Sequence, residues 1–336
     1  MRWAQKAQDK PQAKNGIVGV IYIVAAVLLW SFIPLLIKQV SPPFDPQWVA
    51  ALRLALGAGF IAIAERVVAG ASSPSSPGPR HWRRREQVLL IFAGAAIAGD
   101  YLLYTAGIRL TTASAGNLVV QIEIIALSLW GLIILKESAG AAKLAGMALC
   151  FSGVFLVAWN GQGLTALARS EYSVGNLIVA AGGMCWSFYA LGQKMLLETR
   201  GAGQTVVPIM LIGAGISVAV AIFSPLATRP PTSLQWALLI GLGSVCTGLA
   251  YFLMVRGLQR LEASHVALLA TLNPVLTMTE AHFLLGEKLS GFLLGGAGLI
   301  VAGVCLIAAV GSRVSRPQSA SAVPETRRQV ERQSVG

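Results

Sequence analysis

Three ionisable side chains lie inside long apolar runs of this sequence. Glu123 is at the middle of residues 111–137, TTASAGNLVVQIEIIALSLWGLIILKE, while Asp100 and Arg53 lie within the runs at 87–108 and 47–69. A charge at the centre of a bilayer costs about 2.5–3.5 kcal/mol on insertion scales, so such residues usually line a substrate or ion pathway. We therefore expect Glu123 to carry a proton or to bind a substrate amine. A structural hydrogen bond or ion pair between helices is the alternative.

Asp100 and Arg53 allow two interpretations. An Arg–Asp ion pair within the bilayer would lower the cost of both charges and would fix the packing of two helices. An unpaired Arg53 would instead bind a substrate carboxylate, because the guanidinium fork matches that geometry. The sequence leaves both interpretations open.

Polar residues in the run around Glu123 fall on one face of a straight helix. Ser114, Asn117, Gln121 and Ser128 form a narrow stripe at 100° per residue, and Glu123 lies on the opposite side. Both faces of this helix are then expected to contact protein or water. Whether Glu123 faces a cavity or a neighbouring helix stays open.

Aromatic residues and a helix-breaking pair complete the candidate pathway. The aromatic candidates would line a cavity or anchor helices at the interface, and they are Trp30, Trp186, Tyr101 and Tyr251. In a later run, Asn273 precedes Pro274, which interrupts the hydrogen-bond ladder and frees carbonyls for substrate or water.

Other charged residues lie near the ends of apolar runs. A proton role is conceivable for His282, but Glu280 and His282 are expected to be an exposed polar pair near the wet boundary. Glu137 and Glu287 each end a run. They are expected to cap or position the next helix, or to pair with the adjacent Lys136 and Lys288.

The composition indicates a membrane protein with many spans. The chain has 336 residues, of which 55% are hydrophobic and 12% charged, about half the charge of a soluble domain. The net charge of +12 does not indicate nucleic-acid binding, since the charges lie between the apolar runs and at the termini. The four cysteines lie singly within apolar runs, without disulfide or metal-ligand spacing.

Ten spans of bilayer length are predicted. They cover residues 17–38, 47–69, 87–108, 112–135, 142–159, 174–197, 205–226, 234–256, 263–285 and 291–311. Residues 1–16 and 312–336 are expected to be a cytoplasmic segment and a disordered cytoplasmic tail. With the N-terminus inside, the outer side receives only Lys38, Arg109, Arg169, Arg229 and Lys288 of the Lys and Arg residues outside the spans. This bias places both termini in the cytoplasm.

The chain repeats itself. Trp30-Ser31-Phe32 matches Trp186-Ser187-Phe188 at a shift of 156 residues, and a series from Tyr101 to Gly153 matches Tyr251 to Gly303 at a shift of 150. Each unit, 17–159 and 174–311, holds five predicted spans. Because five is odd, the second unit enters the membrane upside down, as in the inverted repeats of many secondary transporters.

These residues resemble the EamA-like members of the drug/metabolite transporter superfamily. The resemblance rests on Trp-Ser in the first helix, on WVAALR (48–53) in the second, on TTASAGNLVVQIE…LKE, and on EASHVALLATLNPVL…LLGEKL before a Gly-rich last helix. It implies ten helices around a central cavity and transport of small metabolites, often outward. The family usually has X-Pro in the fourth helix, where this chain has Glu123-Ile124. We therefore expect a straighter fourth helix.

The sequence favours a transporter over an enzyme. It has no phosphate-binding loop, metal-binding helix or serine nucleophile motif, so no cofactor is expected. We expect a secondary exporter of an amino-acid-like or drug-like metabolite in the inner membrane, driven by protons or exchange. The alternatives are an importer or exchanger, a membrane-embedded enzyme acting on a lipid-linked substrate, and a sensor. Glycines of the fifth and tenth helices favour close helix packing or a homodimer contact.

Overall fold

The computed structural model describes residues 12–71, 81–134, 136, 140–161, 170–261 and 263–314. Its regular elements there are all helices, in the order α1 (Gln12–Ser31), α2 (Ile33–Val40), α3 (Pro46–Ala71), α4 (Arg84–Leu110), α5 (Ala113–Val119), α6 (Ile122–Ile133), α7 (Ala141–Trp159), α9 (Glu171–Leu197), α10 (Ala202–Ala221), α11 (Ser233–Gly243), the π-helical η2 (Ser244–Leu249), α12 (Ala250–Leu258), α13 (Ala263–Ala270), α14 (Leu272–Leu285) and α15 (Gly291–Val314). In this part of the chain, 9 stretches are long and apolar enough to cross a membrane. The predicted all-helical membrane fold is confirmed at this level.

The predicted span at 263–285 is not one helix. It consists of α13, with 8 residues, and α14, with 14 residues. The predicted span at 205–226 is too long, since α10 ends at Ala221. Pro225 explains this end, because a proline disfavours helical backbone at the residue before it. The chain segments 1–11 and 315–336 lie outside the described residues.

The expectation of a straighter fourth helix is wrong. That stretch is broken into α5 and α6 at Val120–Gln121, although no proline is present. The amides of Gln121, Glu123 and Ile124 bond to carbonyls three residues back, at 3.2, 3.0 and 3.0 Å. Such tight turns leave carbonyls without helical partners, and Gln121 Nε2 donates to one of them, Asn117 O, at 3.4 Å. A side chain of the break therefore replaces the missing backbone bond.

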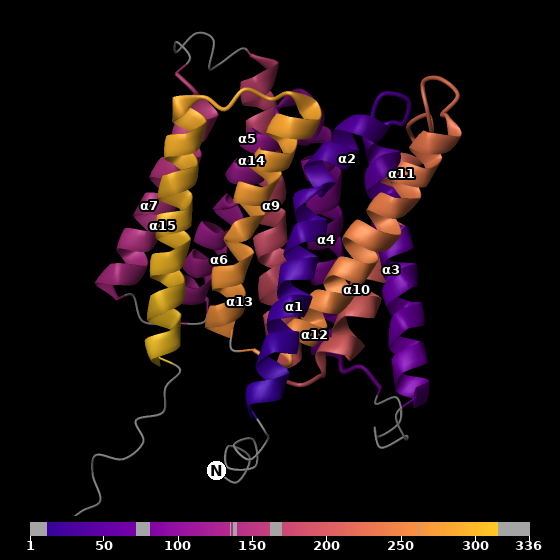
Figure 1. The fold of residues 1–336 in the computed structure, drawn as a ribbon. Coiled ribbons are helices and arrows are strands. Elements are labelled where there is room, and N and C mark those ends of the chain that lie inside the picture. The colour runs from indigo at the N-terminus through magenta and orange to yellow at the C-terminus, as the bar shows by residue number, and fades with distance from the viewer. Residues whose placement is uncertain are drawn as a thin grey trace, which may run out of the picture.

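The helices form one bundle (Figure 1). α1 begins and α15 ends at the same end of it, drawn lowest in Figure 1, and α6 and α13 also lie toward that end, whereas α5 and α14 lie toward the other. α7 and α15 pack closely because glycines face each other. A Cβ on Gly153 would lie 2.6 Å from Gly296 O, and one on Gly146 would lie 2.8 Å from Gly303 O. The glycine faces thus serve a contact within the chain.

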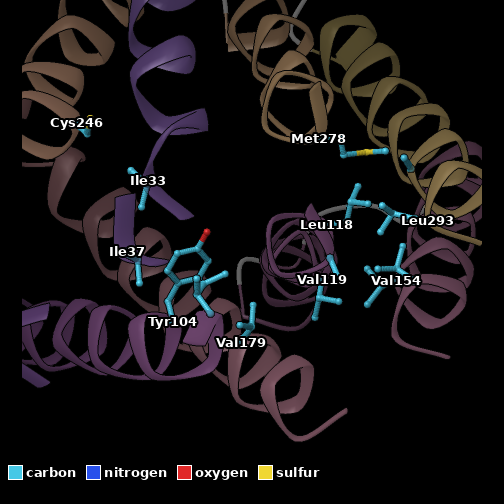
Figure 2. Close-up of a cluster of buried hydrophobic side chains, with 14 of the residues drawn as sticks. Ile33, Ile37, Tyr104, Leu118, Val119, Val154, Val179, Cys246, Met278 and Leu293 are labelled. Carbon is cyan, nitrogen blue, oxygen red and sulfur yellow. The ribbon is translucent and has the colours of Figure 1, made fainter. Parts of the chain in front are cut away.

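Apolar side chains fill the spaces between helices. Figure 2 shows one cluster, in which residues of α5 such as Leu118 and Val119 meet Val154 of α7 and Met278 of α14. Other large apolar side chains point outward, among them Phe223 and Phe283 with 88% and 78% of their surface exposed. An outer surface of this kind suits a hydrocarbon environment.

Candidate functional site

A cavity of about 620 Å³ lies within the bundle and is lined by residues of α1, α2, α3, α4, α5, α6, α9, α10, α12, α13, α14 and α15. Its lining includes all ten residues that the sequence singled out, namely Trp30, Arg53, Asp100, Tyr101, Asn117, Gln121, Glu123, Trp186, Tyr251 and Asn273. The lining extends to Leu197, Leu258, Val266 and Ala308, on helices that reach the end of the bundle where α1 begins (Figure 1). The structure therefore brings residues of twelve helices to one cavity that extends toward one end of the bundle.

Arg53 is held in place by uncharged groups. It is 6% exposed, its Nε donates to Thr247 Oγ1 at 3.1 Å, and its guanidinium lies 4.3 Å from the centre of the Tyr101 ring. Thr247 belongs to the π-helical η2 and donates to Leu242 O, five residues back, at 3.0 Å. The wider π-helical turn thus places a hydroxyl against Arg53, and the Tyr101 ring makes a cation–π contact with the guanidinium.

The ion pair between Arg53 and Asp100, one of the two interpretations of the sequence, is not formed in the structure. Within the described residues, no ion pair or hydrogen bond joins Asp100 or Glu123 to another side chain, although Asp100 is 8% exposed. Both carboxyl groups line the cavity together with Arg53. Carboxyl groups that form no hydrogen bond or ion pair in such a place are free to bind a ligand or a proton.

Glu123 does not lie opposite the polar stripe. Asn117, Gln121, Glu123 and Ser128 all line the same cavity. The prediction assumed a continuous helix, but Glu123 lies in the first turn of α6, after the break. The break changes the direction of the helix, and with it the face on which Glu123 projects. Ser114, on α5, is buried and does not line the cavity.

Aromatic rings pair along the cavity wall. Trp30 of α1 meets Tyr251 of α12 edge to face with ring centres 5.5 Å apart, and Trp186 meets Tyr189 of α9 at 6.0 Å. Edge-to-face contact is the preferred arrangement of such rings. The ring pairs leave apolar faces beside the three ionisable groups.

Some lining residues were not predicted from the sequence. They are Tyr104, Tyr189, Gln193 and Lys194. Tyr104 and Tyr189 lie three or four residues from predicted candidates, at Asp100 and Trp186, which is the spacing of one helix face and could have identified them. In Figure 2 the Tyr104 hydroxyl points away from the apolar side chains around it.

Polar contacts join α1, α5 and α14 at the cavity wall and next to it, and we call them the seal. Asn117 Nδ2 donates to Asn273 Oδ1 at 2.8 Å and also to Thr277 Oγ1, and Thr277 donates to Ser31 O at 3.0 Å. Ser31 Oγ contacts Glu280 Oε1 at 2.7 Å. Asn117 and Asn273 line the cavity, whereas Ser31, Thr277 and Glu280 do not. The seal therefore joins α1, α5 and α14 from the cavity wall outward.

The remaining acidic residues have other surroundings than expected. Glu280 is not an exposed residue, since its Oε2 atom is buried without a hydrogen-bond partner, whereas His282 is exposed. Glu287 does not cap the helix that follows it. Its carboxylate accepts from the Ala113 and Ser114 amides at 2.6 and 3.1 Å, and so caps α5. Glu137 lies outside the described residues.

A second polar cluster ties α4 to the connection after α9. Arg200 Nη2 donates to Glu86 Oε2 at 2.8 Å and its guanidinium lies 4.4 Å from the centre of the Trp82 ring. Hydrogen bonding to the Glu86 carboxylate raises the pKa of Arg200 above its ordinary value. Within the described chain, no group of His, Cys, Asp and Glu is arranged to hold a metal ion.

Comparison with known proteins agrees with this architecture. The profile of the "EamA-like transporter family" matches residues 17–159 and 173–309. An "Uncharacterized transporter" of Archaeoglobus fulgidus is 27% identical over 86% of this chain and 96% of its own length. The "Uncharacterized inner membrane transporter YhbE" of Escherichia coli K12 is 24% identical over 88% and 92%.

Two further similarities extend the comparison. A "Probable amino-acid metabolite efflux pump" of Salmonella typhimurium is 27% identical over 90% of this chain and 97% of its own length. A solved structure, titled "Crystal structure of protein", has a TM-score of 0.61 at 22% identity, over 91% of this chain and 100% of that one, and shares the fold. Since the family profile covers most of the sequence in two copies, this chain is a multi-pass membrane transporter that belongs to the EamA-like transporter family.

Proposed function

We propose that the protein is a secondary active exporter of small organic metabolites. It works by alternating access between two inverted five-helix repeats, as in other transporters that bind substrate near the bilayer midplane. Both termini lie in the cytoplasm and the membrane is a bacterial-type inner membrane. The observation that carries the proposal is the joint presence of Arg53, Asp100 and Glu123 in one cavity without ion pairs among them.

The charges of the cavity fit an amino-acid-like substrate. A zwitterion would place its carboxylate on Arg53, whose fork binds carboxylates well, and its amine on Asp100 or Glu123. The rings of Trp30 and Trp186 would then contact the apolar part of the substrate. The printed name of the Salmonella typhimurium relative supports this substrate class.

The geometry also supports export from the cytoplasm. The cavity extends toward the end of the bundle where α1 begins, and the bias of Lys and Arg supports a cytoplasmic location for that end. A substrate would enter from this side. A proton moving inward gains about 2.3 kcal/mol per 100 mV, so one proton carried by Glu123 would suffice to drive its export.

Flux measurements test the proposal directly. The purified protein is first screened for thermal stabilisation by amino acids and their amine-only and acid-only analogues. The compound that stabilises it most is then loaded into proteoliposomes, with and without an inwardly directed proton gradient. We expect zwitterions to stabilise more than either analogue, and the gradient to accelerate their export.

Matched variants make the result specific. Arg53→Met should abolish the preference for zwitterions over amines, whereas Lys288→Met, at an exposed position outside the cavity, should leave it unchanged. Equal stabilisation by all three compound types would contradict the zwitterion assignment. Flux that ignores the proton gradient would contradict proton coupling and favour exchange.

A further inference from the structure

Two serine hydroxyls at helix contacts differ in the kind of partner that they meet. Ser187 of α9 accepts from Trp130 Nε1 at 2.9 Å and donates to Met184 O at 2.6 Å. A hydroxyl has one hydrogen to donate and lone pairs that accept. Ser187 uses both, so this contact is fully satisfied.

Ser31 of α1 meets two oxygens that would both accept if Glu280 were ionised. Its Oγ lies 2.7 Å from Leu28 O and 2.7 Å from Glu280 Oε1. One hydroxyl hydrogen cannot serve a carbonyl and a carboxylate together. If Glu280 is a neutral acid, its O–H donates to Ser31, and Ser31 donates to Leu28 O. Only the protonated acid satisfies both contacts.

The sequence repeat relates the two contacts position by position. Ser31 and Leu28 correspond to Ser187 and Met184 at a shift of 156 residues, and Glu280 corresponds to Trp130 at a shift of 150. Glu280 thus occupies the place of an indole N–H, which is a permanent donor. A carboxyl group in that place can donate only while it holds its proton.

Apart from the Ser31 hydroxyl, the described surroundings of Glu280 supply no group that would stabilise a negative charge. Its Oε2 is buried without a partner, and none of the described Lys, Arg or His side chains forms an ion pair with it. The described titratable groups on α14 and on the elements against it are Tyr22, Lys38, Cys246, His265 and His282. Of these, Lys38 interacts electrostatically with Glu287, and His282 contacts the Glu287 carbonyl at 2.9 Å.

We propose that Glu280 is a proton-binding residue of the seal, neutral while the seal is closed. The proton comes from water at the outer end of the bundle and binds the carboxylate. It then forms the hydrogen bond to Ser31 that joins α14 to α1. Opening the seal exposes the carboxyl group to water, where it releases the proton to the same side. This inference rests on the proposed function in one respect only, namely that the seal opens toward the outer end of the bundle.

The expected pH dependence follows from the hydrogen bond. At low external pH, Glu280 stays neutral and the closed seal keeps all its bonds. As pH rises, the ionised carboxylate and the Leu28 carbonyl compete for one hydrogen, and the seal loses a hydrogen bond. Loss of one such bond shifts the balance between closed and open states by roughly tenfold.

Infrared difference spectroscopy reads the protonation without any transport. The full-length protein in lipid is titrated, and the spectrum of Glu280→Gln is subtracted from that of the wild type. We expect a protonated-carboxyl band at neutral pH that is absent in the variant, while Trp130→Phe retains it. If the difference spectrum shows only a carboxylate band, the proposal is overturned, whatever the transport activity.

Distance measurements test the consequence for the seal. Spin labels are placed at the exposed positions Gln39 and Lys288, in a variant whose four natural cysteines are replaced by alanine. We expect the open population to grow roughly tenfold as pH is raised. In Glu280→Gln, whose amide donates permanently to Ser31, it should stay low at every pH.

Two variants keep the test decisive. Ser31→Ala removes the acceptor of the neutral acid, and should move the opening to lower pH. Trp130→Phe removes the donor of the corresponding contact and should open with the same pH dependence as the wild type. A Glu280→Gln protein that opens with the wild-type pH profile would overturn the proposal.

Discussion

Two broken helices of this transporter, α5–α6 and α13–α14, break at corresponding places but carry different groups. The break between α5 and α6 includes Gln121, and the break between α13 and α14 is at Thr271, which is 150 residues later. Just after each break, the first half of the chain has Glu123 and the second half has Asn273. The two halves thus share the helix break, but only the first half has an ionisable group at this position of the cavity.

The comparison shows that a proline is not needed for the break. Pro274 lies in the first turn of α14, where a missing N–H leaves no bond unmade, whereas α6 has Ile124 at the corresponding place. In the first half, tight turns and the Gln121 side chain replace the lost bonds. In the second half, Thr271 Oγ1 donates to Leu268 O at 2.6 Å.

The largest expected effect concerns the group that distinguishes the two breaks. Glu123→Gln removes the ionisable group but keeps the shape, and should weaken binding of an amine-bearing substrate by roughly 10- to 100-fold, as for loss of a charged hydrogen bond. Thermal-shift titration with the best ligand of the screen measures it.

An exchange variant makes this prediction stricter. Asn273 donates to Val27 O at 3.3 Å and accepts from Asn117, so its place serves the seal. The double variant Glu123→Asn, Asn273→Glu should therefore not recover binding. Recovery would mean that a carboxylate anywhere in the cavity is sufficient, and that the asymmetry of the halves has no role in binding.

The second effect concerns the packing over the first break. Gly183 of α9 faces it, and a Cβ there would lie 2.8 Å from Val120 O. The corresponding residue over the second break is Val27. Gly183→Val should lower the free energy of unfolding by about 1–3 kcal/mol through overpacking. The melting temperature in detergent measures it, and Gly298→Val, where nothing lies within 4 Å, is the control.

The third effect concerns the cap of α5. The Glu287 carboxylate accepts hydrogen bonds from two backbone amides at the N-terminus of α5. In Glu287→Gln the side-chain carbonyl oxygen can still accept one of them, but the negative charge is lost. Loss of such a cap costs about 1 kcal/mol. The melting temperature should fall slightly, while Glu171→Gln, at an exposed position, should have a smaller effect. Glu171 is an acid in the first turn of α9, so an equal effect of both changes would show that the two hydrogen bonds of Glu287 add no stability beyond that of such a charge.

The smallest effect concerns the permanent donor of the first half. Trp130→Phe loses the hydrogen bond to Ser187 but can keep a ring stacked on Phe188, whose centre lies 4.8 Å from that of Trp130. Because the ring stacking is kept, the free energy of unfolding should fall by about 0.5 kcal/mol, the low end of the range for one hydrogen bond. Because no proton is exchanged, the decrease should be the same at every pH. If the decrease in the free energy of unfolding varied with pH, the Trp130–Ser187 contact would not differ from the Glu280–Ser31 contact in the way that we propose.

The sequence predicted the membrane class and the cavity residues because both follow from the free-energy cost of placing a residue in water or in the bilayer, which each stretch of sequence shows by itself. Apolar runs of bilayer length can hardly be stable elsewhere, and Arg53, Asp100 and Glu123 each stand out against such runs. The family resemblance also followed from local patterns, and the profile match confirms it. Helical periodicity failed at Glu123, since it assumes one continuous helix and the break at Val120–Gln121 has no proline to signal it.

What the sequence by itself determined is which groups are ionisable or polar within the apolar spans. Only the tertiary structure decided their partners. It holds Arg53 on Thr247 and Tyr101 instead of Asp100, and it buries an oxygen of Glu280 against α1 instead of exposing it. Partners are set by contacts between residues up to 249 positions apart. No local pattern reports such contacts, because they depend on how the helices of the two halves pack.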